Sequence, residues 1–446
     1  MTPPRLPDSA SDSPDALEPG GADWSGIRDV ERRPRRRPRK PPRQPRTRGP
    51  RRPPTAIWQT RAGRTLAAAV GVLLLATAIG LIALWPSSRA SAGPSQAFGG
   101  SSLPATVRSS ALVRCPGPTA QQCRRITVKI TGGRTTGQIT PITLGPVTTA
   151  PDVSAGAHIR VTRVSAPGAA QGPGFEPYSF VDYDRHGSLL WLAIAFGLLA
   201  VVLARWRGAL ALVGVVLSLL LVTKFIVPAI LAGSSPLLVS LVGSLAVMYL
   251  TVGLTNGVGV QSLAAALGIG TSLLLATLLG DAYTHIAQLN GYSSELSTVL
   301  RQFTTQVSLE GVVIAGIVIG ALGVLADMGV SQASAVMALR RANPQYSARD
   351  LYREAFTIGR DHLAATIHTL VLAYVGASLP LLLVLQSAHA GFFDAVNTQD
   401  IAEPIIATLV GSIALIAAVP LTTGLTALLA AGVPAAALPD GHGHAH

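Results

Sequence analysis

Two apolar runs decide the fold of this chain: GVVIAGIVIGALGVLA at residues 311–326 and LAATIHTLVLAYVGASLPLLLVL at residues 363–385. Runs of this length are typical of helices that cross the hydrocarbon core of a bilayer. The first run ends on Asp327, and the second follows Gly359-Arg360-Asp361-His362. A carboxylate near the membrane interior is costly unless it has a partner or a role. The stretch therefore predicts a pair of transmembrane helices with charged residues at one edge.

Six more apolar runs lie outside this pair. Hydrophobic residues make up 49% of the chain and charged residues only 13%, and such clustering in runs of about twenty is typical of an integral membrane protein. We predict an all-α polytopic membrane protein of about eight transmembrane helices, with a small extracytoplasmic β domain and a disordered N-terminal arm. The expected spans are 65–85, 189–204, 209–231, 236–254, 260–279, 311–326, 363–385 and 404–431, of which the last seven form a transmembrane domain at 188–431.

Residues 1–57 form an Arg- and Pro-rich arm that we expect to be disordered and cytoplasmic. From Arg28 to Arg64 there are fifteen Lys/Arg against only Asp29 and Glu31, so this segment carries the whole net charge of +13. It has too little apolar surface to fold. We interpret the arm as a solvated tail that enforces orientation and binds anionic lipid headgroups. Nucleic acid is a less favoured partner, because no aromatic side chains interleave with the arginines as base-stacking platforms.

The span at 65–85 is expected to anchor an exported domain at residues 86–187. Ala90-Ser91-Ala92 has the form of a signal-peptide cleavage site, but the long basic prefix and long apolar run favour an uncleaved anchor. Within 86–187, turn-forming residues separate short β-branched runs whose alternation predicts strands. The expected strands are 126–131, 138–144, 158–164 and 178–183. A small β-barrel or sandwich is expected, with an OB-like barrel as one alternative.

The two cysteines of the chain, Cys115 and Cys123, both fall in the exported domain. On the oxidising side of a membrane, a disulfide that closes this short loop is favoured. A metal site is the alternative, but no other thiol or imidazole lies near them in the sequence. We therefore predict a disulfide.

The short loops favour one orientation, with both termini in the cytoplasm. Loops predicted to lie outside carry only one basic residue, Arg301, together with acidic residues such as Glu295 and Asp394. Loops predicted to lie inside carry Arg205, Arg207, Arg340, Arg341, Arg349, Arg353 and Arg360. We expect a multi-pass protein of the plasma membrane.

One face of the span at 311–326 carries small residues followed by a carboxylate. The stripe Gly316, Gly320, Gly323, Asp327, Ser331 and Ser334 advances by three or four residues, so it lies on one side of a helix, and its glycines predict close packing of a second helix. Asp327 is expected near the cytoplasmic edge. It is interpreted either as a cation or proton site or as an interfacial carboxylate paired with an arginine of the following loop, and the second reading is slightly favoured.

Four polar residues of other spans are further candidates. Asp281 and His285 are four residues apart at the predicted outer edge, where they could bind a proton or metal, although a polar helix end is favoured. Lys224 is expected either to extend toward the lipid headgroups or to pair with Asp281 or Glu310. His368, inside the span at 363–385, could line a polar path together with Tyr374, although a hydrogen-bonded structural histidine is the commoner case.

The two ends of the transmembrane domain carry weaker signals. Ser347-Ala348-Arg349-Asp350 has the form of a capping box, and predicts the start of a short amphipathic helix at 351–356 that lies along the cytoplasmic surface. The tail at 432–446 contains His442, His444 and His446, which could hold a transition metal only loosely.

Three linked motifs closely resemble the YibE/F family of bacterial multi-spanning membrane proteins. They are Ala326-Asp327-Met328-Gly329-Val330-Ser331, Gly359-Arg360-Asp361 and Ala373-Tyr374-Val375-Gly376-Ala377-Ser378-Leu379-Pro380. The resemblance covers about residues 105–430 and leaves out the basic arm and the His-rich tail. It implies a multi-pass fold in a bacterial plasma membrane, and it implies no particular activity.

The sequence contains no H-E-x-x-H, G-x-S-x-G or G-x-x-x-x-G-K-[ST] motif, so we expect neither an enzyme nor a cofactor. A gradient-driven transporter or permease is favoured, because Asp327, Lys224, Asp281 and Glu310 are expected within or near the membrane. The alternatives are a non-transporting envelope scaffold whose exported domain binds a partner and, as the least favoured, a membrane-embedded enzyme. Clustering of Asp281, His285 and Glu310 around one cavity would favour the enzyme. Besides lipid, the expected partners are a second copy of the chain or an envelope protein.

Overall fold

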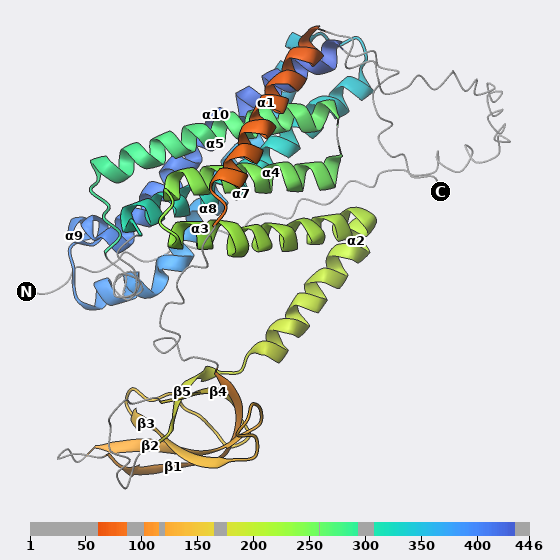
Figure 1. Ribbon diagram of the computed structural model, residues 1–446. Coiled ribbons are helices and arrows are strands. Elements are labelled where there is room, and N and C mark those ends of the chain that lie inside the picture. The colour runs from red at the N-terminus through yellow and green to blue at the C-terminus, as the bar shows by residue number, and fades with distance from the viewer. Residues whose placement is uncertain are drawn as a thin grey trace, which may run out of the picture. The chain divides into compact units, whose positions relative to one another are not determined.

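The computed structural model describes residues 61–86, 102–115, 121–164, 176–257, 259–292 and 307–432. The predictions for the arm at 1–57, for Ala90-Ser91-Ala92 and for His442, His444 and His446 lie outside these residues. The described chain is mostly helical and contains one antiparallel sheet (Figure 1).

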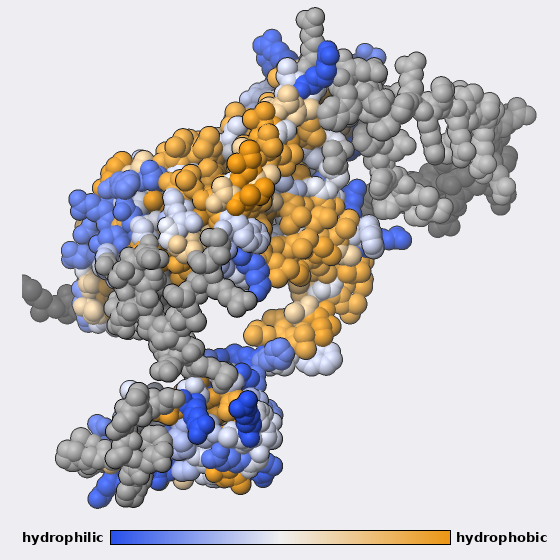
Figure 2. All heavy atoms as spheres, viewed as in Figure 1, coloured by the Kyte–Doolittle hydropathy of each residue, from blue (hydrophilic) through white to orange (hydrophobic). Residues whose placement is uncertain are grey.

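Seven helical segments of the described chain are long and apolar enough to cross a membrane. Hydrophobic residues cover much of the helical surface visible in Figure 2, as contact with lipid requires. The segments are α1 (Arg61–Ala83), α2 with its continuation (His186–Leu231), α4 (Pro236–Asn256), α5 (Val260–Ile286), α7 (Leu309–Ala342), α8 (Ala348–Ser387) and α10 (Gln399–Gly432). The short helix α9 (Phe392–Asn397) precedes α10.

The segment His186–Leu231 contains two of the eight predicted spans. It has 46 residues, so a straight helix would be about 70 Å long, roughly twice the hydrocarbon thickness. The helix α2 (His186–Leu221) instead bends at Arg205, which has φ 54° and ψ −133° (Figure 1). A Cβ on Gly208 would overlap the carbonyl oxygen of Ala200, so the bend requires glycine there. The predicted spans at 189–204 and 209–231 correspond to the two limbs.

Helices α4, α5, α7 and α10 share one hydrophobic core. Its closest interhelical contacts are made at glycines other than the predicted ones. A Cβ on Gly268 of α5 would overlap Thr422 of α10, and a Cβ on Gly329 of α7 would overlap Ile269 of α5. Small residues at these points let the helix backbones approach closely.

Helix α8 is continuous over 40 residues. Ser347 forms the predicted capping box with Asp350, but the expected short surface helix is wrong. Residues 351–356 are instead the first turns of α8, because Leu351 and Ala355 are buried in the bundle. Most of the remaining length of α8 is exposed.

The sheet lies between α1 and α2 in the sequence. Strands β1 (Leu103–Arg114), β2 (Gln122–Ile130), β3 (Ile139–Pro146), β4 (His158–Arg163) and β5 (Tyr178–Tyr183) form a five-stranded antiparallel half-barrel. The strand order is β3-β2-β1-β4-β5, and β3 also contacts β5. This arrangement is that of a partly open barrel, consistent with the OB-like alternative. The first strand, β1, had not been predicted.

Candidate functional site

Gln332 of α7 connects three helices inside the bundle. Its side chain is only 2% exposed. With the amide oriented to satisfy both of its polar atoms, Nε2 donates to the Thr423 hydroxyl of α10 (3.2 Å) and to the Ala355 carbonyl oxygen of α8 (3.3 Å). The amide oxygen accepts from the Gly359 N–H of α8 (3.2 Å). A buried amide is stable only when it is paired in this way, so Gln332 fixes α8 against α7 and α10.

Gly359, which opens one of the family motifs, has a structural reason to be glycine. A Cβ at this position would overlap the Gln332 amide and would lie 2.9 Å from Cγ1 of Val419 on α10. The close approach of α8 therefore depends on the absence of a side chain at Gly359.

A second polar link joins α5 to α7. The Gln261 amide nitrogen donates to the Ser334 hydroxyl over 2.5 Å. Gln261 is the second residue of α5, beside the α4–α5 turn. The core therefore contains two hydrogen-bonded amides between helices: Gln261 joins α5 to α7, and Gln332 joins α7 to α8 and α10.

Several buried hydroxyls of the bundle are not paired in this way. Five Ser and Thr hydroxyls have no hydrogen-bond partner among the described residues, and they come from α4, α5 and α10: Ser244, Ser262, Ser272, Thr284 and Thr422. By contrast, the Thr277 hydroxyl donates to the Leu273 carbonyl oxygen of its own helix (2.8 Å). Leaving a buried hydroxyl unpaired costs about 1–3 kcal/mol, so these hydroxyls, like that of Tyr249 on α4, can accept a new partner.

Three titratable residues meet where α5 ends and α7 begins. His285 Nδ1 lies 2.8 Å from Glu310 Oε1, and His285 Nε2 lies 3.8 Å from Asp281 Oδ1. Their side chains are 63%, 37% and 41% exposed, respectively. The cluster therefore lies on an exposed surface and does not surround an enclosed cavity. Among the described residues, no group of three His, Cys, Asp or Glu has the arrangement of a metal site.

The charged residues of the 310–385 stretch are not brought together. Asp327 is exposed on α7, and Arg360, Asp361 and His368 are exposed on α8. Within the described chain none of their side chains makes an ion pair or hydrogen bond, so the predicted pairing of Asp327 with an arginine is absent. The reason is that Gln332 and Gly359 fill the α7–α8 contact, and their charged neighbours point away from it.

Lys224 lies in a π-helical turn, η4 (Val222–Ile226), between α2 and α3 (Val227–Leu231). Pro228 has no N–H to donate to the Lys224 carbonyl oxygen, which accounts for the wider turn. The side chain of Lys224 is exposed, whereas Phe225 beside it is fully buried and stacks on Trp85. Among the described residues Lys224 forms no ion pair, so the alternative pairing with Asp281 or Glu310 is not observed.

The predicted packing stripe of α7 faces away from the core. A Cβ on Gly316 or Gly323 would meet no described atom of another element within 4 Å, and both glycines are exposed. Gly320 alone approaches a neighbour, Oη of Tyr374 on α8, at 3.0 Å from its added Cβ. The packing prediction is therefore wrong for Gly316 and Gly323 within the described chain, because the larger aliphatic residues of α7 face the core instead.

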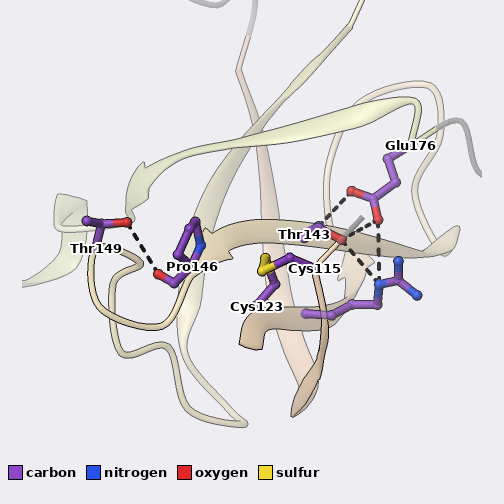
Figure 3. Close-up of a disulfide and its surroundings, with 7 residues drawn as sticks. Cys115, Cys123, Thr143, Pro146, Thr149 and Glu176 are labelled. Carbon is purple, nitrogen blue, oxygen red and sulfur yellow. Dashed lines mark hydrogen bonds and ion pairs between the residues drawn. A yellow bond between two sulfur atoms is a disulfide. The ribbon is translucent and has the colours of Figure 1, made fainter. Parts of the chain in front are cut away.

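The half-barrel carries the predicted disulfide, between Cys115 and Cys123 (Figure 3). Glu176, which precedes β5, accepts from the Thr143 backbone N–H (2.6 Å) and hydroxyl (2.7 Å) of β3 (Figure 3). Between β5 and α2, the hydrogen bond from Arg185 holds the pKa of the Asp182 carboxyl below its usual range. These contacts stabilise the barrel and its exit into α2, and the Glu176 carboxylate occupies one backbone donor of β3.

Sequence reasoning missed Gln332, Thr423 and Gln261, whereas Ser334 was part of the predicted stripe of α7 and had no partner assigned to it. Their signal was present, since two of them are amide side chains inside otherwise apolar helices. Such residues normally face the interior of a helical bundle. The carboxylates were predicted as site residues instead, because a charge near the membrane interior is costly.

Comparison with known proteins agrees with the helical part of this description. A family profile described as YibE/F-like protein matches residues 192–432, which is more than half of the chain and excludes the half-barrel. No curated protein matches the chain, and no solved structure matches it. The chain is a multi-span membrane protein that belongs to the YibE/F-like protein family.

Proposed function

We propose that this protein is a gradient-driven transporter or permease of the bacterial plasma membrane, and that α5, α7 and α10 form its transport core. The observation that carries this proposal is the set of unpaired hydroxyls on α5 and α10, of which Ser272 and Thr422 are fully buried. Charged side chains do not support the proposal, because they are exposed and form no ion pairs with one another: Asp327, Arg360, Asp361 and Lys224.

The physical argument concerns the cost of these hydroxyls. Each unpaired group destabilises the packed bundle by about 1–3 kcal/mol, and inside a membrane no lipid group can offer a hydrogen bond. A solute or ion that passes through the core can provide the missing partners, as in transporters that bind their substrate between helices. The interhelical amides Gln332 and Gln261 would hold the flanking helices in register during that passage.

A gradient is the proposed source of energy because the sequence has no nucleotide-binding loop. The loop arginines favour an orientation with both termini in the cytoplasm and the half-barrel outside. The same proposal gives the protein no catalytic role, since the cluster of Asp281, His285 and Glu310 is exposed and does not surround a cavity.

Currents across a supported membrane that carries the purified full-length protein test this proposal. The probes are Na⁺, K⁺, phosphate and a mixture of amino acids, each applied with and without an imposed proton gradient. We expect at least one probe to give a current that Thr422→Val lowers about tenfold, since the substitution removes a hydroxyl that would pair with the solute. Thr277→Val is the matched control, because the Thr277 hydroxyl is already bonded within its own helix.

The stability of Thr422→Val distinguishes a functional loss from misfolding. Replacing an unpaired buried hydroxyl by a methyl group removes a desolvation cost, so the thermal midpoint should stay the same or rise. Absence of any current, from protein that is folded and correctly inserted, would contradict the proposal. If removal of residues 86–187 then abolished the activity in cells while Thr422→Val did not, the envelope scaffold would replace it.

A further inference from the structure

Asp281, His285 and Glu310 join the ends of two neighbouring helices. Asp281 and His285 lie one turn apart at the end of α5, and Glu310 is the second residue of α7. The imidazole contacts both carboxylates, at 2.8 Å for Glu310 and 3.8 Å for Asp281. One side chain thus connects two acids that come from different helices.

The two helix ends favour opposite charges, and these are the charges of a His285–Glu310 ion pair. The end of α5 carries the negative pole of its dipole, which favours a positive charge on His285. The start of α7 carries the positive pole, which favours the negative charge of Glu310. A protonated His285 would therefore interact favourably with Glu310, with Asp281 and with the end of its own helix.

Charged groups on the neighbouring elements do not change this arrangement. Helix α4 carries no Asp, Glu, Lys, Arg or His. Helix α10 carries Asp400 and Glu403 near its start, and neither makes an ion pair with His285 among the described residues. Helix α1 carries Arg61 and Arg64 in its first turn. The charged and titratable side chains of α8 lie in its first half, and none of them forms an ion pair with His285 among the described residues: Arg349, Asp350, Arg353, Glu354, Arg360, Asp361, His362 and His368.

A buried polar group lies in the same turn of α5. Thr284, adjacent to His285, is fully buried, and its hydroxyl has no described hydrogen-bond partner. Thr284 therefore faces the protein interior, whereas His285 beside it in the sequence is exposed.

We propose that Asp281, His285 and Glu310 form a proton-binding site that tightens the connection between α5 and α7 when His285 is charged. Histidine gains its proton in the mildly acidic range in which membrane proteins experience pH changes. The neutral imidazole can still donate from Nδ1 to Glu310, but loss of the proton removes the charge attraction to Glu310 at 2.8 Å and to Asp281 at 3.8 Å. The link therefore weakens as pH rises. This site does not depend on transport, because it concerns a contact within the bundle.

Thermal unfolding of the purified full-length protein in detergent, from pH 5.5 to pH 8.0, tests the proposal. The wild-type midpoint is expected to fall by about 2 °C more than that of His285→Gln across this range, an effect kept small by the exposure of the pair. Glu310→Gln should lose part of the pH dependence, because the amide accepts a hydrogen bond but carries no charge. His362→Gln is the matched control, and it should behave as wild type.

Infrared spectra of the same samples give a second measurement that needs no comparison of stabilities. The imidazole band of His285, identified by its absence from the spectrum of His285→Gln, should change between pH 5.5 and pH 8.0. Glu310→Gln should shift the pH at which this band changes. Equal pH dependence of the midpoint in wild type and His285→Gln would overturn the proposal. An imidazole band that does not change over this range would also overturn it. If the proton response were present but no current were found, the transport proposal alone would fail.

Discussion

Helices α7 and α8 follow each other in the chain, and they differ in how they are held. Both are long and apolar, with 34 and 40 residues. Helix α7 buries side chains along its whole length, whereas α8 buries only Leu351, Ala355 and Gly359 in its first turns. Apolar composition therefore identifies a membrane span, but the placement of glycines and polar side chains decides which helix is packed. We infer that the buried attachment of α8 is around Gln332, whereas Leu363, Ile367 and Tyr374 farther along the helix pack against the core only partly buried.

The largest expected effect is at this attachment. Gly359→Val should destabilise the protein by about 2–3 kcal/mol, because its side chain would overlap the Gln332 amide and Val419. Thermal unfolding in detergent measures this change. Gly376→Val on the same helix is the control, since no described atom of another element lies within 4 Å of its added Cβ. Equal losses of stability for the two variants would show that the contact at Gln332 is not the main attachment of α8.

The two faces of α7 should respond to alanine with opposite signs. Gly329→Ala should cost about 1–2 kcal/mol, because the new Cβ would overlap Ile269 of α5. Gly323→Ala should stabilise the helix by about 0.5–1 kcal/mol, because alanine is the better helix former and its Cβ meets open space. Chemical or thermal unfolding of both variants checks the signs. A destabilising Gly323→Ala would mean that a second copy or another partner covers this face.

The start of α8 contributes less. Ser347→Ala should cost about 1 kcal/mol, because it removes the hydroxyl that accepts from the Asp350 N–H in the capping box. The same unfolding assay measures it. Ser387→Ala, which removes a hydroxyl bonded only within the last turn of α8, should have no measurable effect. A silent Ser347→Ala would show that the first turns of α8 are held by packing alone.

The smallest effect is expected at Asp327, the carboxylate that follows the apolar run at 311–326. Asp327→Asn should change stability by less than about 0.5 kcal/mol, because the carboxylate is exposed and makes no described ion pair or hydrogen bond. The probe-driven currents should also remain at the wild-type level. A large loss of stability or of current would show that Asp327 contributes to folding or to transport.

These contrasts show what the sequence could predict. The spans follow from apolar runs, and β2, β3, β4 and β5 follow from alternation, because both patterns are local. Strand β1 was missed since its register shifts between Val107 and Ser109, which interrupts the alternation. The disulfide followed from a short loop in an exported domain. Such features are fixed by neighbours in the chain.

The rest of the candidate site depends on tertiary contacts that no local pattern contains. Glu310 and His285 are 25 residues apart in the sequence, so only the packing of α5 on α7 brings them together. The glycine stripe of α7 had the correct helical period, but periodicity alone does not identify the face that is buried. Gln332 and Gly359 become partners only because α8 folds back beside α7.

Chemical labelling of single cysteines tests the central claim, that α5, α7 and α10 enclose a path open to water-soluble solutes. Both native cysteines are joined in a disulfide, so each introduced thiol is the reactive one. The account predicts that a small charged thiosulfonate reagent modifies Thr422→Cys and Ser272→Cys in intact membranes and spares Ala414→Cys, whose position on α10 is equally buried but has no polar group. If Thr422→Cys and Ser272→Cys are as unreactive as Ala414→Cys, the core is closed and the account is contradicted.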